Sequence, residues 1–274
     1  MTVTFAVIGR NEAPTLRTSL GQALEAAEPG DRVIFVDGAS SDGSADIARA
    51  MGVEVVPGGV GKGRAVAAAA RAAGDGPLCT VDADIEWSER NIPAALREAY
   101  VRTAADLVVG HFVQHARLRT LTPGLYRPLV GALFPEALDY VGPTPVSGFR
   151  LLGAGRMPRT LPSGYGLETY LNLRFALDGL RVEIVDLGLY DGPLKAYSNI
   201  ERMAADILEA ILDLAVAERR LDASMRPAWE GWARAIADHA RSLPVPPGER
   251  DAFEDRLLAL AARPLPAARA AVVP

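Results

Sequence analysis

Leu78-Cys79-Thr80-Val81-Asp82-Ala83-Asp84 is an apolar run that ends in two aspartates two residues apart. A short apolar run of this kind, bounded by turn formers, is typical of a buried strand. Two carboxylates at the point where the chain leaves a sheet can share one hard divalent cation, because Mg²⁺ and Mn²⁺ prefer oxygen ligands. The alternative is a pair of solvated turn acids or a helix N-cap, and the Asp-x-Asp spacing by itself leaves both open.

Strand-like and helix-like stretches alternate through the first half of the chain. This alternation predicts an α/β fold, in which a mainly parallel sheet is flanked by helices. In such sheets ligands bind beyond the carboxyl ends of the strands, which is where the pattern places Asp37 and Asp82. Strands are expected at residues 2–8, 32–36, 53–56, 77–81 and 106–109, and helices at residues 13–27, 40–51, 61–73 and 91–101.

The second half of the chain is expected to be irregular first and helical later. Residues 120–166 are rich in Pro and Gly, which favours loops. Trp229 and Trp232 are three residues apart on one predicted helical face, a spacing more typical of a core than of an interface. A strand is expected at residues 181–186, and helices at residues 200–221, 229–243 and 250–262.

The composition is that of an ordinary soluble globular protein. Of its 274 residues 49% are hydrophobic and 23% are charged, which suffices for a sizeable core in one large or two small domains. The net charge of −5 and the lack of a Lys/Arg block argue against nucleic acid as a partner. The single cysteine, Cys79, argues against disulfides and a cysteine-based zinc site.

The sequence also bears on the cellular location. No apolar run is long enough to form a transmembrane helix, so no membrane span is expected. The first residues form a short strand-like run without the basic region of a secretory signal. The expected location is therefore the cytoplasm.

Three further motifs carry polar groups next to expected element ends. In Val36-Asp37-Gly38-Ala39-Ser40-Ser41-Asp42-Gly43-Ser44, the Asp37 carboxylate could accept hydrogen bonds from a base, or the cluster could only cap the next helix. In Gly61-Lys62-Gly63-Arg64, the glycines would let the backbone approach a phosphate and Lys62 would supply charge, although the spacing is not that of a Walker A loop. In Gly164-Tyr165-Gly166-Leu167-Glu168, the acid could serve a ligand or only complement a helix dipole.

Other site classes find little support in the sequence. His111, His115 and His239 do not have the spacing of metal ligands, and a surface or core role is favoured for each. No Gly-x-Ser-x-Gly elbow is present, which argues against an α/β-hydrolase. No Gly-x-Gly-x-x-Gly follows the first strand, which argues against a dinucleotide-binding fold.

Taken in order, these motifs resemble those of the GT-A glycosyltransferases of the family-2-like group. The second half is similar to the retaining glucosyl-3-phosphoglycerate synthases and to the related mannosyl-3-phosphoglycerate synthases. The resemblance extends from about Val3 to Leu212. It rests on Val7-Ile8-Gly9-Arg10-Asn11-Glu12, the Asp37, Lys62 and Asp82 motifs, Arg127-Pro128-Leu129, Pro145-Val146-Ser147-Gly148, the Gly164–Glu168 motif and Val185-Asp186-Leu187-Gly188.

The resemblance implies a Rossmann-like GT-A sheet with a helical C-terminal extension. Residues 1–110 would form the half that binds a nucleotide sugar, residues 111–199 the half that binds the acceptor, and residues 200–274 the helical extension. The partners implied are a nucleotide sugar and a small-molecule acceptor. The helices from Ile200 onward could cover the site or form the contact of a homodimer. The cofactor implied is Mg²⁺ or Mn²⁺.

The resemblance also implies roles for individual residues. Lys62, Asp84 and Glu168 would be the catalytic group, with Lys62 near the base or diphosphate and Glu168 near the donor sugar. Asp82 and Asp84 would hold the metal, with Asp84 the better candidate for a direct ligand. The nucleotide would be bound by Gly9, Asn11, Glu12, Asp37, Gly38, Lys62, Asp82 and Ala83, and the sugar and acceptor by Arg119, Thr120, Thr122, Ser147, Gly148, Gly166, Glu168 and Asp191.

The chain departs from the family pattern after Val185-Asp186-Leu187-Gly188. An ungapped reading places Gly192 where the family has a metal-binding histidine. Either Asp191 replaces that ligand, or the metal has fewer protein ligands. Pro193-Leu194 stands in place of an Arg-Asn pair that helps to hold phosphoglycerate, so Arg119, Thr120 and Thr122 are the remaining candidates for an anion pocket.

The activity expected on this basis is that of a metal-dependent hexosyltransferase. It would move a sugar from a nucleoside diphosphate sugar, with UDP-glucose favoured, to a small phosphorylated or carboxylated acceptor such as 3-phosphoglycerate, with retention of configuration. Two alternatives remain open. The acceptor could be a secondary metabolite or a nucleoside-type compound, or the protein could bind nucleotide sugars without turnover.

Overall fold

The computed structural model describes residues 2–114, 120–193, 197–241 and 246–269. The chain divides into two compact units. The first unit comprises Met1–His115, Val141–Gly164 and Asp178–Leu194, and the second comprises Ala116–Tyr140, Tyr165–Leu177 and Lys195–Pro274. The division into residues 1–110, 111–199 and 200–274, which concerned function, stays a prediction.

The first unit is built on a mixed sheet of eight strands in the order β3-β2-β1-β4-β7-β6-β8-β5. Neighbouring strands β1, β2, β3 and β4 pair in parallel, as do β6 and β8, whereas β7 and β5 run antiparallel to their neighbours. The predicted mainly parallel sheet is therefore confirmed. The strands are β1 Thr4–Gly9, β2 Arg32–Asp37, β3 Glu54–Pro57, β4 Leu78–Asp82, β5 Trp87–Ser88, β6 Leu107–Val113, β7 Arg150–Leu152 and β8 Val182–Asp191.

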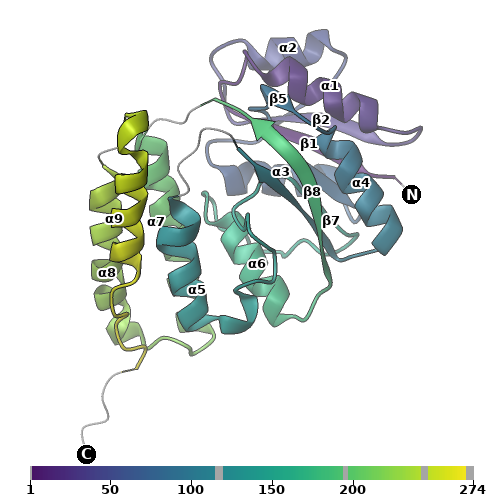
Figure 1. Ribbon diagram of the computed structural model, residues 1–274. Coiled ribbons are helices and arrows are strands. Elements are labelled where there is room, and N and C mark those ends of the chain that lie inside the picture. The colour runs from purple at the N-terminus through teal and green to yellow at the C-terminus, as the bar shows by residue number, and fades with distance from the viewer. Residues whose placement is uncertain (1, 115–119, 194–196, 242–245, 270–274) are drawn as a thin grey trace, which may run out of the picture. The chain divides into compact units, whose positions relative to one another are not determined.

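Helices cover both faces of this sheet (Figure 1). Phe5 and Val7 of β1 pack with Leu16 and Leu20 in one buried cluster, because alternate residues of a strand point to the same face. The intervening residues of the same strands face the Ala-rich helix α3 on the other side. The first face is covered by α1 Leu16–Ala26, α2 Ser44–Ala50 and α4 Ile92–Thr103, and the second by α3 Lys62–Ala73.

The register of the central strands brings the acidic strand ends together. Gly9 pairs with Asp37 on β2, and Ile8 pairs with Asp82 on β4. Because these three strands are parallel, their carboxyl ends lie at one edge of the sheet. The edge predicted to carry the site is thus the one at which Asp37 and Asp82 lie.

The expectation of loops throughout residues 120–166 was wrong. Arg127–Leu133 forms helix α5, and its Pro128 lies in the first turn, where the missing N–H of proline costs no hydrogen bond. A π-helix at Thr122–Tyr126 and a 3₁₀ turn at Pro135–Ala137 flank α5, and Arg150–Leu152 joins the sheet as β7.

Several expected element bounds were also wrong, among them the strand expected at 106–109, which continues as β6 to Val113. Helix α2 begins at Ser44 rather than at residue 40, because the preceding Ser and Asp groups hydrogen-bond to another loop. The strand expected at 181–186 continues to Asp191, since β8 pairs along its length with β6 and then with β5.

The second unit is helical. This agrees with the helical C-terminal extension that the resemblance predicted. Trp229 and Trp232 are 1% and 6% exposed, which confirms their assignment to a core. The Arg220 guanidinium binds Glu136 and lies over the ring of Phe134. No helix among the described residues has both the length and the hydropathy to cross a bilayer. Besides α5, the helices are α6 Leu167–Leu177, α7 Tyr197–Ala217, α8 Arg226–Ala240 and α9 Arg250–Ala261, with short turns at Ala223–Met225 and Pro247–Glu249.

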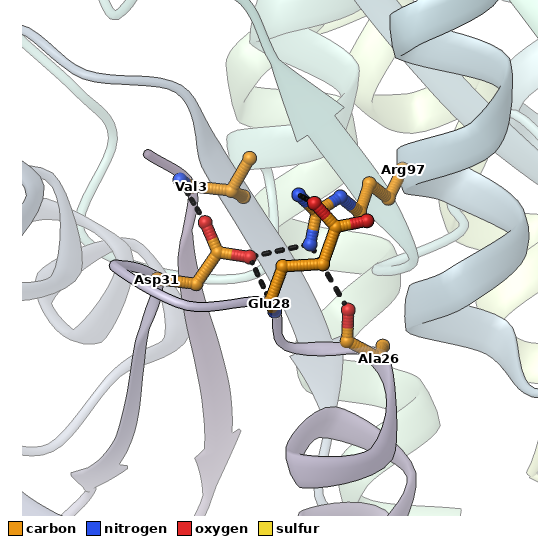
Figure 2. A network of polar contacts seen from close by, with 5 residues as sticks. All are labelled: Val3, Ala26, Glu28, Asp31 and Arg97. Carbon is orange, nitrogen blue, oxygen red and sulfur yellow. Dashed lines mark hydrogen bonds and ion pairs between the residues drawn. The ribbon is translucent and has the colours of Figure 1, made fainter. Parts of the chain in front are cut away.

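A charged network ties three elements together at the start of β1 (Figure 2). The Asp31 side chain is 1% exposed, and its two oxygens accept hydrogen bonds from the N–H groups of Val3 (2.8 Å) and Glu28 (2.9 Å). The Arg97 guanidinium on α4 donates to Asp31, to the Glu28 carboxylate and to the carbonyl oxygen of Ala26. The buried carboxylate therefore holds the β1 start, the α1–β2 turn and α4 in one arrangement.

We expect Asp31→Ala to lower the free energy of unfolding by about 3–5 kcal/mol, because it leaves the Arg97 charge and two N–H groups without their buried acceptor. Urea unfolding followed by circular dichroism measures the change. The control is Asp46→Ala, which breaks an exposed pair with Arg49 and should cost less than about 1 kcal/mol. Equal losses in the two variants would contradict this account of the network.

Candidate functional site

Two loops at the carboxyl edge of the sheet are joined by side chain–backbone hydrogen bonds. The N–H of Asn11 donates to the Ser40 hydroxyl (2.9 Å), and the Ser41 N–H donates to the Asn11 amide oxygen (2.8 Å). Asn11 adopts φ +58°, a left-handed conformation that asparagine tolerates better than most residues. The Glu12 N–H donates to the Ser44 hydroxyl at 3.1 Å. Asn11 thus fixes the shape of the edge next to Glu12.

Asp42 belongs to the same hydrogen-bonded loop pair. Partial burial pushes the pKa of Asp42 upward, but hydrogen bonds from the Ser44 hydroxyl and from the N–H groups of Ala13 and Ser44 outweigh this effect. The pKa of Asp42 therefore lies below its ordinary value of 3.8. The Asp37 carboxylate at the end of β2 also accepts a hydrogen bond, from the N–H of Ser40 (3.0 Å). Asp37 therefore orders the loop that follows β2.

Glycines at the edge permit close approach of neighbouring backbones. A Cβ on Gly9 would lie 2.5 Å from the Cβ of Ala83, and a Cβ on Gly38 would lie 2.9 Å from that of Arg10. Gly9, Gly38 and Ala83, predicted to contact a nucleotide, thus also have packing reasons to be small. Their contact with a nucleotide stays a prediction.

The centre of the site is an ion pair between Lys62 and Asp82. Asp82 ends β4 on the face that α3 covers, and Lys62 is the first residue of α3. The Lys62 Nζ lies 2.9 Å from Asp82 Oδ1, and the two side chains are 16% and 24% exposed. A Cβ on Gly148 would overlap the Asp82 carboxylate and lie 2.5 Å from the Lys62 Nζ. The fold thus brings together three residues that the sequence singled out at distant positions.

The loop that carries Gly148 is held by a buried arginine. Arg150 on β7 is 2% exposed, and its guanidinium donates to the carbonyl oxygens of Ser147 (2.6 Å) and Pro145 (2.7 Å). The Thr80 hydroxyl donates to the carbonyl oxygen of Gly148 at 2.9 Å. Ser147 itself is buried, and its hydroxyl accepts from the N–H of Phe149. Sequence reasoning missed Arg150, although an arginine within the apolar run Phe149–Leu152 was a usable signal.

The glycines of Gly61-Lys62-Gly63 make room for the protein's own backbone. A Cβ on Gly61 would lie 2.5 Å from the carbonyl oxygen of Ser163, and one on Gly63 would overlap that of Pro162. The N–H groups of Gly63 and Arg64 donate to the carbonyl oxygens of Gly164 (3.2 Å) and Ser163 (3.3 Å). The expectation that these glycines admit a phosphate is therefore corrected, because a chain segment occupies that place.

Asp84 lies in a closely bonded environment just beyond β4. It is 3% exposed, and the Tyr190 hydroxyl donates to its Oδ1 at 3.0 Å. The flanking backbone is held by α1, since the Thr15 hydroxyl donates to the carbonyl oxygen of Ala83 (2.8 Å) and the Ile85 N–H donates to Ser19 (3.3 Å). Sequence reasoning missed Tyr190, whose role depends on where the end of β8 lies.

The two aspartates fit a cation that takes its remaining ligands from elsewhere. Among the described residues no group of three or more His, Cys, Asp or Glu side chains is placed to hold a metal ion. Mg²⁺ commonly binds through one or two carboxylates and completes its shell with water and substrate phosphates, which Asp82 and Asp84 could serve. Asp191 as a third ligand stays a prediction, and its carbonyl oxygen accepts from the N–H of Glu86 at 3.1 Å.

The two histidines that the structure describes have other partners. His111 lies with its Nδ1 3.3 Å from the Thr144 hydroxyl, and His239 of the second unit stacks on Phe253. His115 lies outside the described residues.

Five of the predicted residues belong to the second unit, which is described by itself, and four of them lie among the described residues. Glu168 on the first turn of α6 is 4% exposed, and Asn172 one turn later donates to the Tyr126 hydroxyl at 3.2 Å. Thr120 precedes the π-helix, and Thr122 is its first residue. A π-helix is a rare element that is frequent at functional sites. A Cβ on Gly166 would overlap the Asp206 carbonyl oxygen of α7, which accounts for the glycine. Arg119 lies outside the described residues.

The sequence matches a protein-family model, and the fold matches solved structures. The family model described as Glycosyl transferase family 2 matches residues 4–151, more than half of the chain. No curated protein matches the sequence.

Solved structures of glucosyl-3-phosphoglycerate synthase from Mycobacterium tuberculosis share the fold. Its complex with phosphoglyceric acid has a TM-score of 0.67 at 22% identity, covering 77% of this chain and 79% of that one. Its complex with Mg²⁺ and uridine diphosphate has a TM-score of 0.67 at 22% identity, covering 77% and 78%. Its complex with Mn²⁺, UDP-glucose and phosphoglyceric acid has a TM-score of 0.67 at 21% identity, covering 78% and 79%.

We expect Gly63→Ala to lower the free energy of unfolding by about 1–3 kcal/mol, because the new Cβ overlaps a backbone carbonyl that cannot move alone. Gly21→Ala is the matched control, since a Cβ at Gly21 in α1 meets nothing within 4 Å. It should raise stability by about 0.5–1 kcal/mol through helix propensity. Urea unfolding of both variants checks the prediction, and a neutral Gly63→Ala would contradict the docking of residues 162–164.

We expect Asp42→Asn to remove part of the acid sensitivity of the protein. The folded-state pKa of Asp42 is lowered, so its stabilising contribution is full above the ordinary value of 3.8 and is lost as the pH falls below it. The stability difference between wild type and variant should therefore be constant near neutral pH and shrink in acid. Unfolding midpoints measured across that range test this, and a difference independent of pH would contradict it.

Proposed function

This chain belongs to glycosyl transferase family 2, and we propose that it transfers a sugar from a nucleoside diphosphate sugar to a small acceptor. The favoured donor is UDP-glucose, and the favoured acceptor is phosphorylated or carboxylated, such as 3-phosphoglycerate. The observation that carries the proposal is the gathering of Lys62, Asp82 and Gly148 at the carboxyl edge of the parallel strands. Asp84 follows Asp82 by two residues at the same edge. Ligands of sheets of this kind bind at that edge.

The solved structures of similar fold support the choice of ligands. The synthase from Mycobacterium tuberculosis was solved with Mn²⁺, UDP-glucose and phosphoglyceric acid together. Its fold is shared over about three quarters of both chains, although the identity is only 21%.

Asp82 and Asp84 would hold Mg²⁺ or Mn²⁺, which when bound would neutralise charge on the diphosphate leaving group. Lys62 already lies against Asp82 and would supply a second positive charge near the diphosphate. Gly9, Asn11, Glu12, Asp37, Gly38 and Ala83 line the neighbouring strand ends and loops and would bind the nucleoside.

The remaining roles concern the sugar and the acceptor. Glu168 would face the donor sugar. Retention of configuration is proposed from the resemblance to the retaining synthases. Among the described residues no side chain stands out as a nucleophile for double displacement, so the proposed route is a front-side transfer within the donor–acceptor pair. The residues that would bind the sugar and the acceptor, as the resemblance implies, are Arg119, Thr120, Thr122, Ser147, Gly148, Gly166 and Asp191.

A different acceptor is a second candidate, favoured by one observation. In the segment after β8, Pro193-Leu194 stands where the resembled family has an Arg-Asn pair that helps to hold phosphoglycerate. A secondary metabolite or a nucleoside-type acceptor would not need such a pair. A protein that binds nucleotide sugars without turnover would show no sugar release with any acceptor.

We expect the purified protein to consume UDP-glucose in the presence of Mn²⁺ and 3-phosphoglycerate, and to lose that activity in EDTA. Release of UDP and formation of a glucosylated product are measured with a panel of acceptors and with UDP- and GDP-sugars. Product with another acceptor alone would favour the second candidate. Neither product nor Mn²⁺-dependent binding of a nucleotide would overturn the proposal.

Asp84→Asn, which keeps the size of the buried side chain, should lower the metal-dependent rate about 100-fold or more. Asp46→Asn on the exposed face of α2 is the control and should keep wild-type activity. Thermal unfolding of both variants shows whether the loss reflects chemistry or folding. Full turnover by a folded Asp84→Asn variant would remove Asp84 from the mechanism.

A further inference from the structure

We infer that Tyr190 is a positioning residue, whose hydroxyl holds the Asp84 carboxylate in the orientation that a divalent cation requires. The inference rests on the proposed function, because it presupposes that Asp84 faces a cation. It assigns to Tyr190 neither substrate contact nor metal ligation.

The contact itself is a hydrogen bond between two nearly inaccessible groups. Tyr190 and Asp84 are each 3% exposed, and the hydroxyl donates to Oδ1 at 3.0 Å. A carboxylate taken out of water is costly unless donors satisfy it, and the Tyr190 O–H supplies such a donor to one oxygen of Asp84. The same hydrogen bond fixes the rotation of the carboxylate, as outer partners of metal ligands commonly do.

The hydroxyl is held in place by the packing of its own ring. The Tyr190 ring meets those of Phe112 and Phe149 edge-to-face, with centroids 5.0 Å and 5.1 Å away. The backbone of Tyr190 pairs with Ser88 of β5, the short strand that follows Asp84. The strand pair therefore fixes the backbone that carries the ring, and the ring cannot turn its hydroxyl away without disturbing the aromatic cluster.

Gly192 provides the space that this arrangement needs. A Cβ at this position would lie 2.5 Å from the Asp84 carbonyl oxygen and 2.6 Å from the Tyr190 hydroxyl oxygen. Any larger residue would displace one of the two groups. Two residues at the end of β8 thus act together on Asp84, one by donating a hydrogen bond and the other by lacking a side chain.

Tyr190→Phe tests the inference, because it removes the hydroxyl and keeps the aromatic ring. We expect about tenfold weaker binding of Mn²⁺ in the presence of UDP, measured from the spin-resonance signal of free Mn²⁺. The affinity for UDP in EDTA should change little, since it does not depend on the orientation of Asp84. The unfolding midpoint should fall by the loss of one buried hydrogen bond, and it shows whether the variant is still folded at the assay temperature. Tyr100→Phe is the matched control, as Tyr100 also packs partly buried against the core, and it should bind Mn²⁺ like wild type.

Gly192→Ala is the second variant, and it reaches the same contact from the other side. It should also weaken Mn²⁺ binding, and the double variant should lose less than the product of the two single losses. Wild-type Mn²⁺ affinity in a folded Tyr190→Phe variant overturns the inference and leaves the proposed function standing. Absence of Mn²⁺ binding by the wild-type protein with UDP and with GDP overturns both.

Discussion

β1 is hydrogen-bonded in parallel to β2 on one side and to β4 on the other, and the placement of the candidate site depends on this pairing. The register sets Gly9 opposite Asp37 and Ile8 opposite Asp82, so that loops from three strands leave the sheet at one edge. Strand parity then turns Asp82 toward α3, where Lys62 lies. A shift of the strand register by one residue would turn Asp37 and Asp82 to the opposite faces of the sheet. The burial of the apolar faces, which fixes the register, therefore also fixes the site.

The polar groups at this edge are bonded to one another within the protein. Lys62 pairs with Asp82, Tyr190 holds Asp84, and the Asn11 and Asp42 side chains join two loops. Such prior bonding restricts side-chain motion and lowers the entropic cost of arranging the groups around a ligand. Binding of a diphosphate must then redistribute the Lys62–Asp82 contact, since the ammonium cannot serve both anions equally.

The residues that stabilise the fold and the candidate binding residues lie at opposite ends of the same strands. Asp31 and Arg97 join the chain where β1 and β2 begin, whereas the candidate ligands lie where β1, β2 and β4 end. Residues at the beginning of the strands can therefore be altered with an effect on folding and little direct effect on the site. The buried Arg150 is an exception, because it lies within the sheet and shapes the loop that presses Gly148 against the ion pair.

The sequence alone determined the alternation of strands and helices, the mainly parallel sheet and the acids at the ends of β2 and β4, because these depend on local periodicity and strand length. It did not predict α5, since Pro128 resembles a helix breaker until its place in a first turn is known. It also did not reveal the partners of Asp84 and Gly148. Tyr190 and Arg150 become important only when β8 and β7 enter the sheet, and the glycines at 61 and 63 are explained by a segment one hundred residues away. Contacts between residues so distant in sequence leave no periodic signal, so only the tertiary structure decided them.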